Sequence, residues 1–143
     1  MDDLPPVPKA IAGSLDNVAN SASMRRMKIP SGIVQKTVDD YIARATKLFE
    51  EAGGKIIRNG GPAPTTVIDG KTYKTLGRMN YNNKTITLYD GHQIQDVVEE
   101  LAHFKQAMRD GYWGSATPLP ESVRGLWEKQ IDTLFSNLGF VPE

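Results

Sequence analysis

The chain has 143 residues with 39% hydrophobic and 24% charged residues and a formal net charge of zero, which is typical of one globular domain. It contains no cysteine, which excludes disulfides, thiol nucleophiles and thiolate metal sites, so a metal would need histidine, aspartate or glutamate ligands. No apolar run approaches the roughly 20 residues of a transmembrane helix, and the opening DDLPPVP is unlike a signal peptide.

Residues 1–32 are expected to form a linker or loosely packed arm. This stretch contains four prolines and many small polar residues, which disfavour a packed element. We therefore expect one folded domain over residues 33–143, carrying whatever catalytic activity the chain has.

The first helix is predicted over residues 34–52. Apolar residues recur there at helical spacing, and Gly53-Gly54 supplies the stop. A short strand is expected over residues 55–58, before the turn-forming sequence Asn-Gly-Gly-Pro.

Two hairpins should follow. The first joins residues 65–68 to residues 71–76 through Asp69-Gly70, a pair that tolerates the positive φ angles of tight turns. The second joins residues 77–81 to residues 85–89. These segments predict a small antiparallel sheet of three to four strands.

Two further helices complete the expected α+β fold. The last one should begin near Pro120 and Glu121 and end at Gly139. The helix before it covers residues 95–110 and has two distinct faces. Its apolar stripe consists of Ile94, Val97, Leu101, Phe104 and Met108, and its polar face consists of Asp96, Glu99, Glu100, His103, Gln106 and Asp110.

The polar face of the 95–110 helix is the main candidate for a functional site. Glu99 and Glu100 precede His103 by four and three residues, so the three side chains can converge above the helix. They could bind a metal or move a proton. They could equally be a solvated helix face without a function, since such trios are common on amphipathic helices.

The sequence Glu-Glu-Leu-Ala-His at residues 99–103 resembles the HExxH helix of zincin-like metallopeptidases, with glutamate in place of the first histidine. The expected order of helix, small sheet and helix is also similar to a minimal zincin core. The resemblance implies a zinc site with Glu99 and His103 as ligands and Glu100 as the general base. The third ligand could come from His92, Glu121, Glu128 or Asp132.

The longer pattern EELxHxxQ, in a short cysteine-free domain behind a loose arm, resembles the zincin-like toxin domains at the C-termini of bacterial polymorphic toxins. These include contact-dependent growth inhibition proteins and Rhs-type effectors. The resemblance implies a hydrolase that is delivered into the cytoplasm of a competing bacterium. It also implies a protein substrate there and a cognate immunity protein in the producing cell.

Two other classes of function fit the residues. A metal-independent ribonuclease could use Glu100 and His103 as its acid–base pair, with phosphate contacts from four basic residues: Lys71, Lys74, Arg78 and Lys84. A non-enzymatic binding domain or immunity protein could use the acidic helix face to dock a basic partner.

Overall fold

The computed structural model describes residues 26–143, so most of the expected N-terminal arm lies outside the described residues. Its three helices are α2 (Gly32–Glu51), α3 (Ile94–Asp110) and α4 (Glu121–Leu138). Its strands are β1 (Met27–Lys28), β2 (Lys55–Ile57), β3 (Thr65–Ile68), β4 (Lys71–Lys74), β5 (Gly77–Asn80), β6 (Thr85–Leu88) and β7 (Val141–Pro142). The predicted α+β fold class is confirmed.

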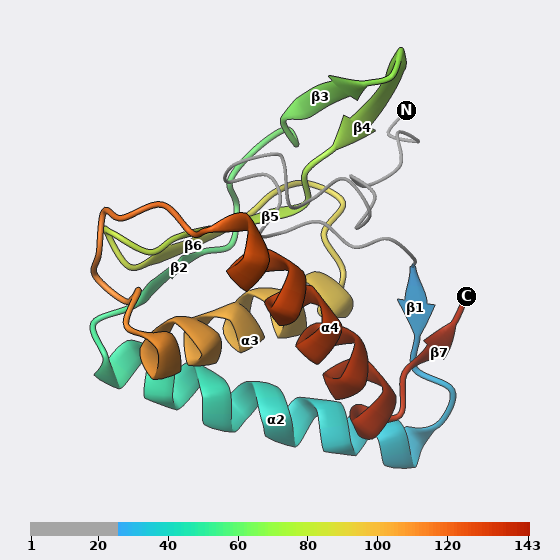
Figure 1. Ribbon diagram of the computed structural model, residues 1–143. Helices are drawn as coiled ribbons and strands as arrows, with labels where there is room; N and C mark the ends of the chain where they lie inside the picture. The colour runs from blue at the N-terminus through green and yellow to red at the C-terminus, as the bar shows by residue number, and fades with distance from the viewer. Residues whose placement is uncertain (1–25) are drawn as a thin grey trace.

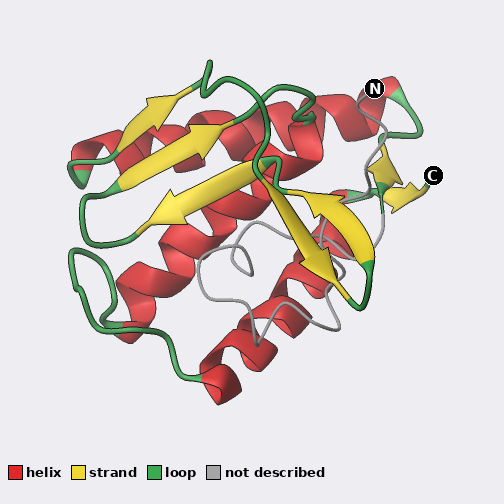
Figure 2. Cartoon of the chain, turned by 90° about the horizontal axis from the view of Figure 1, so that it is seen from above, coloured by secondary structure: helices red, strands yellow, loops and turns green. Residues whose placement is uncertain are grey.

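Helix α3 lies at the centre of the fold, where it contacts α2, α4, β5 and β6 (Figure 1). Figure 2, seen from above, shows the strands lying over the helices. Because neighbours cover α3 on several sides, both its apolar and its polar residues contribute to the interior. None of the helices in residues 26–143 is long and apolar enough to cross a membrane.

Helix α2 begins two residues earlier than the sequence pattern predicts, because the Ser31 side chain caps its N-terminus by accepting a hydrogen bond from Val34 N. The helix buries Phe49, whose ring meets Phe104 of α3 edge to face with centroids 5.2 Å apart. The chain then turns tightly at Gly54, where a Cβ would lie 2.5 Å from the Phe49 ring. Glycine is therefore needed at this helix exit for steric reasons.

The two predicted hairpins form with the expected pairing, but the strands do not make one antiparallel sheet. β5 pairs antiparallel with β6, while β2 pairs parallel with β6 on its other side. β3 and β4 form a separate two-stranded sheet that projects from the rest of the fold (Figure 1). The parallel pairing arises because the whole β3–β5 segment separates β2 from β6 in the chain, which leaves room for the crossover that a parallel pair requires.

The segment from residue 26 to residue 32 is packed rather than loose. β1 pairs antiparallel with β7, so the two ends of the described chain lie side by side. Arg26 contacts Asp96 of α3 with an Nη2–Oδ2 distance of 3.0 Å, and the Met27 backbone N–H donates to the Gln95 side chain. The folded part of the chain therefore extends back to residue 26.

Asp110 at the end of α3 gives the fold an acid-sensitive contact. Its carboxylate accepts hydrogen bonds from Arg109 and, at 2.7 Å, from Trp127 Nε1 of α4. These bonds, that of Arg109 first, lower the pKa of Asp110 to about 2. A lowered pKa stabilises the fold above the unfolded-state value near 4, and this stabilisation is lost as the pH falls towards 2.

We therefore expect Asp110→Asn to cost about 1 kcal/mol of unfolding free energy at pH 7 and to cost less at pH 2.5. Urea unfolding at the two pH values measures this difference. An equal loss at both would show that the carboxylate charge does not contribute.

Candidate metal centre

The polar face of α3 is buried, which overturns the interpretation of a solvated helix face. Glu99, Glu100 and His103 are exposed by 1%, 0% and 1%, whereas Met108, expected in the core, is 50% exposed. The reason is that α4 and β5 both pack against α3. Buried acidic side chains are rare in proteins unless they are paired or bind a metal, so this face is the strongest candidate for a site.

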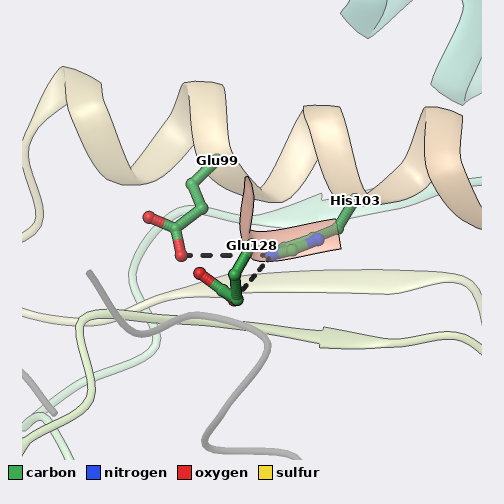
Figure 3. Close-up of side chains that lie close together, drawn as sticks. All are labelled: Glu99, His103 and Glu128. Atoms are coloured by element: carbon green, nitrogen blue, oxygen red, sulfur yellow. Dashed lines mark ion pairs between the residues drawn. The ribbon is translucent and has the colours of Figure 1, made fainter. Parts of the chain in front are cut away.

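Glu99, His103 and Glu128 form one compact group. Each offers a ligand atom, and these atoms lie within 4.8 Å of one another. His103 Nε2 lies 3.9 Å from a carboxylate oxygen of Glu99 and 3.9 Å from one of Glu128 (Figure 3). Both distances exceed hydrogen-bond length, and they are close to the separation of about 3.4 Å between two ligands of one tetrahedral ion with bonds of about 2.1 Å. This group could hold a metal ion.

Two helices supply the group. Glu99 and His103 are one turn apart on α3, which puts them on the same face. Glu128 comes from α4, where the neighbouring Trp127 stacks on the His103 imidazole with centroids 6.0 Å apart. Packing of the indole on the imidazole thus brings α4 close enough for its carboxylate to reach the α3 pair.

Gln106 fixes the orientation and the tautomer of His103. Its Nε2 donates to the Trp127 backbone oxygen at 3.1 Å, which can only accept a hydrogen bond. Gln106 Oε1 must therefore face His103 Nδ1, at 2.8 Å. Nδ1 then carries a proton, and Nε2 is the ring nitrogen that faces the two carboxylates. A ligand histidine of a metal site normally has this arrangement.

We expect Gln106→Leu to weaken zinc binding about 10- to 100-fold, the usual effect of losing a residue that orients a ligand histidine. Leucine has a similar size but cannot bind Nδ1. Calorimetric titration of the metal-free protein with zinc measures the change. Gln130→Ala is the matched control, because Gln130 contacts Gln106 but not His103. Equal zinc affinity in the wild type and Gln106→Leu would contradict this role.

Glu100 lies against β5 and is not one of the three residues of the group. Both of its carboxylate oxygens are buried without a hydrogen-bond partner in the described part of the chain, and a Cβ at Gly77 would lie 3.4 Å from Oε2. Burial, followed by the charges of Asp96 and Glu128, raises the pKa of Glu100 well above its usual value, while Arg78 opposes the rise. Glu100 is therefore a carboxylate with a strong affinity for a proton, next in sequence to Glu99.

The other proposed ligands lie outside this group. His92 is half-buried at the turn before α3, with Nδ1 2.9 Å from the Tyr89 oxygen. Glu121 and Asp132 are exposed on α4, and of the candidate acids on that helix only Glu128 joins the group. Glu128 lies one turn after Arg124, on the buried face of α4 that also holds Trp127 and Ile131. This helical spacing is the signal in the sequence that favours Glu128.

The four basic residues proposed to contact phosphate have different neighbours. Lys71 lies over the Tyr73 ring of the projecting hairpin. Arg78 lies over Tyr89, and Lys84 lies over Trp113 at 5.9 Å, beside Gly114. The Nζ of Lys74 would lie 3.6 Å from a Cβ at Gly91, in the turn before α3.

Comparisons of the chain with protein-family models, curated proteins and solved structures find no match. The resemblance to zincin-like toxin domains therefore stays a prediction. It is carried by the EELxHxxQ pattern of α3, and the geometry of Glu99, His103 and Glu128 is an independent reason to consider a metal centre.

Proposed function

We propose that the protein is a metal-dependent hydrolase in which Glu99, His103 and Glu128 hold the metal. The observation that carries this proposal is the convergence of the His103 imidazole and two buried carboxylates, whose ligand atoms lie within 4.8 Å of one another. A divalent cation would balance the charge of both carboxylates. One imidazole and two carboxylates suit zinc and also harder ions such as Mn²⁺.

Glu100 is the proposed general base. A bound dication would supply a Lewis acid that activates water and polarises the substrate carbonyl. Glu100 accepts a proton as water adds to the carbonyl carbon of an amide, and delivers it to the nitrogen as the C–N bond breaks. Its raised pKa gives Glu100 a higher proton affinity than an ordinary carboxylate has, which suits a group that takes up a proton and then delivers it.

We further propose that the hydrolase acts as a toxin in the cytoplasm of a competing bacterium, with a cognate immunity protein in the producing cell. The resemblance of the EELxHxxQ helix to polymorphic toxin domains supports this biological role. The ribonuclease alternative has less support. Of its four basic residues, Arg78 acts on the charge of Glu100, but Lys71 and Lys84 lie over the rings of Tyr73 and Trp113.

Inducible expression inside a bacterium tests the proposed function. The wild type should arrest growth, and Glu128→Gln should not, because the substitution removes a ligand charge. Glu121→Gln is the matched control on the same helix, since Glu121 is exposed outside the group. Arrest by Glu128→Gln at wild-type strength would refute the metal-dependent mechanism, and cleavage of tRNA or rRNA in arrested cells would favour a ribonuclease instead.

A further inference from the structure

Tyr81 lies beside the candidate metal centre but was not singled out by the sequence. It directly follows β5, and its side chain is 9% exposed. Its ring meets Trp127 edge to face with centroids 6.0 Å apart. The His103 imidazole also packs on this indole. Trp127 thus links Tyr81 to the ligand histidine, and Tyr81 forms part of the surroundings of the site.

The Tyr81 hydroxyl has an unusual environment. It is buried without a hydrogen-bond partner in the described part of the chain, although buried tyrosine hydroxyls usually find one. Four charged residues in or next to the candidate site act on the Tyr81 hydroxyl. Glu100 acts most strongly, followed by Arg124, Glu128 and Glu99. Burial and the Glu100 carboxylate raise the pKa of Tyr81 well above 10, so the hydroxyl keeps its proton at neutral pH and can donate it in a hydrogen bond.

We propose that Tyr81 is a further catalytic residue whose hydroxyl donates a hydrogen bond to the substrate oxygen that becomes negatively charged during hydrolysis. This inference rests on the proposed function. When water adds to the carbonyl carbon and its proton passes to Glu100, the former carbonyl oxygen holds the negative charge until the C–N bond breaks. A neutral phenol can stabilise that charge without itself losing the proton.

A purely structural role explains the ring of Tyr81 but not its hydroxyl. Tyr112 also packs edge to face on Trp127, with centroids 5.9 Å apart, and is half-buried. The Tyr81 hydroxyl is buried without a hydrogen-bond partner in the described part of the chain, and the Tyr112 hydroxyl is not among such groups. Removal of the Tyr112 hydroxyl is therefore the matched control.

The test compares Tyr81→Phe, Tyr112→Phe and Glu100→Gln with the wild type. Growth arrest in the inducible strain reports activity, thermal unfolding and zinc titration report the fold and the metal site, and acetohydroxamate is the probe for the oxygen contact. We expect Tyr81→Phe to slow the reaction about 100- to 1,000-fold and therefore to lose growth arrest. Acetohydroxamate should bind zinc-loaded Tyr81→Phe about three- to tenfold more weakly than the wild type. Zinc affinity and Tm should not change.

Each other outcome overturns the inference. If Tyr81→Phe arrests growth like the wild type while Glu100→Gln does not, Tyr81 is not catalytic and the proposed function survives. If Glu100→Gln also arrests growth, both proposals fail. If Tyr81→Phe loses zinc affinity or Tm, its hydroxyl is structural. If Tyr112→Phe weakens arrest and acetohydroxamate binding as much as Tyr81→Phe does, the effect belongs to the packing around Trp127.

Discussion

Glu100→Gln is expected to abolish activity and, at the same time, to make the metal-free protein more stable at neutral pH. Loss of a general base usually slows a reaction about 100- to 10,000-fold. The same substitution increases stability, because glutamine has nearly the same shape as glutamate but carries no negative charge whose burial costs free energy.

The direction of the stability change follows from the raised pKa of Glu100, whose causes are burial and the charges of Asp96 and Glu128. A carboxyl group with a higher pKa in the folded state than in the unfolded state stabilises the fold fully below the unfolded value, near 4.5. That stabilisation is lost as the pH rises through the folded-state pKa. The wild type should therefore lose stability between acidic and neutral pH, and Glu100→Gln should lose less.

Thermal unfolding of chelator-treated protein at pH 5 and pH 8 measures this effect. We expect the Tm of Glu100→Gln to exceed that of the wild type at pH 8 by about 2 to 8 °C, which corresponds to roughly 1–2 kcal/mol. The difference in Tm between Glu100→Gln and the wild type should be smaller at pH 5. Glu50→Gln, on the exposed side of α2, is the control and should change neither activity nor the pH profile. A lower Tm at pH 8 for Glu100→Gln would show that the ionised carboxylate stabilises the fold.

Zinc is expected to raise the Tm of the chelator-treated wild type and to have little effect on Glu128→Gln. A ligand at 100 times its Kd adds about 2.7 kcal/mol to the unfolding free energy, which corresponds to a Tm rise of about 5–11 °C for a chain of this size. If the substitution weakens binding about 100-fold, the same zinc concentration adds only about 0.4 kcal/mol.

Glu121→Gln, at the start of the same helix, should keep the full zinc-dependent rise. His103→Ala should lose it, because the imidazole is the nitrogen ligand of the group. A zinc-dependent rise of equal size in wild type and Glu128→Gln would place any bound ion elsewhere.

Local patterns in the sequence were sufficient to predict the helices and hairpins. Helix α4 ends at Gly139, which has the left-handed φ of +100° that favours glycine. Asp69-Gly70 likewise turns the first hairpin, with both residues at positive φ. The helix end and the hairpin turn depend only on residues that are close together in the sequence, so the sequence alone predicts them.

Contacts between distant segments could not be predicted in the same way. The parallel pairing of β2 with β6 depends on where the chain returns after two hairpins. The burial of Glu99, Glu100 and His103 depends on α4 and β5 packing over a helix face that polarity alone assigns to solvent. An amphipathic pattern identifies the apolar side of a helix but not a second neighbour that covers the polar side.

The candidate site was likewise predictable from the sequence only in part. Glu99, Glu100 and His103 lie within one helical turn, so the sequence already placed them together. Glu128 was one of several acids that could complete the group, and the packing of Trp127 on His103 brings its carboxylate there. Tyr81 is one of five tyrosines in the chain, and no sequence motif surrounds it. Only the structure identifies it, because its hydroxyl is buried beside the site.

The most direct measurement of the central claim is X-ray diffraction from crystals grown with zinc, with data collected on both sides of the zinc absorption edge. We expect an anomalous difference peak between the carboxylates of Glu99 and Glu128 and His103 Nε2, at about 2.0–2.2 Å from each ligand atom. The peak should be absent from crystals of Glu128→Gln grown in the same way. Wild-type crystals that bind zinc only at surface residues, with no peak among these three side chains, would contradict the proposed metal centre.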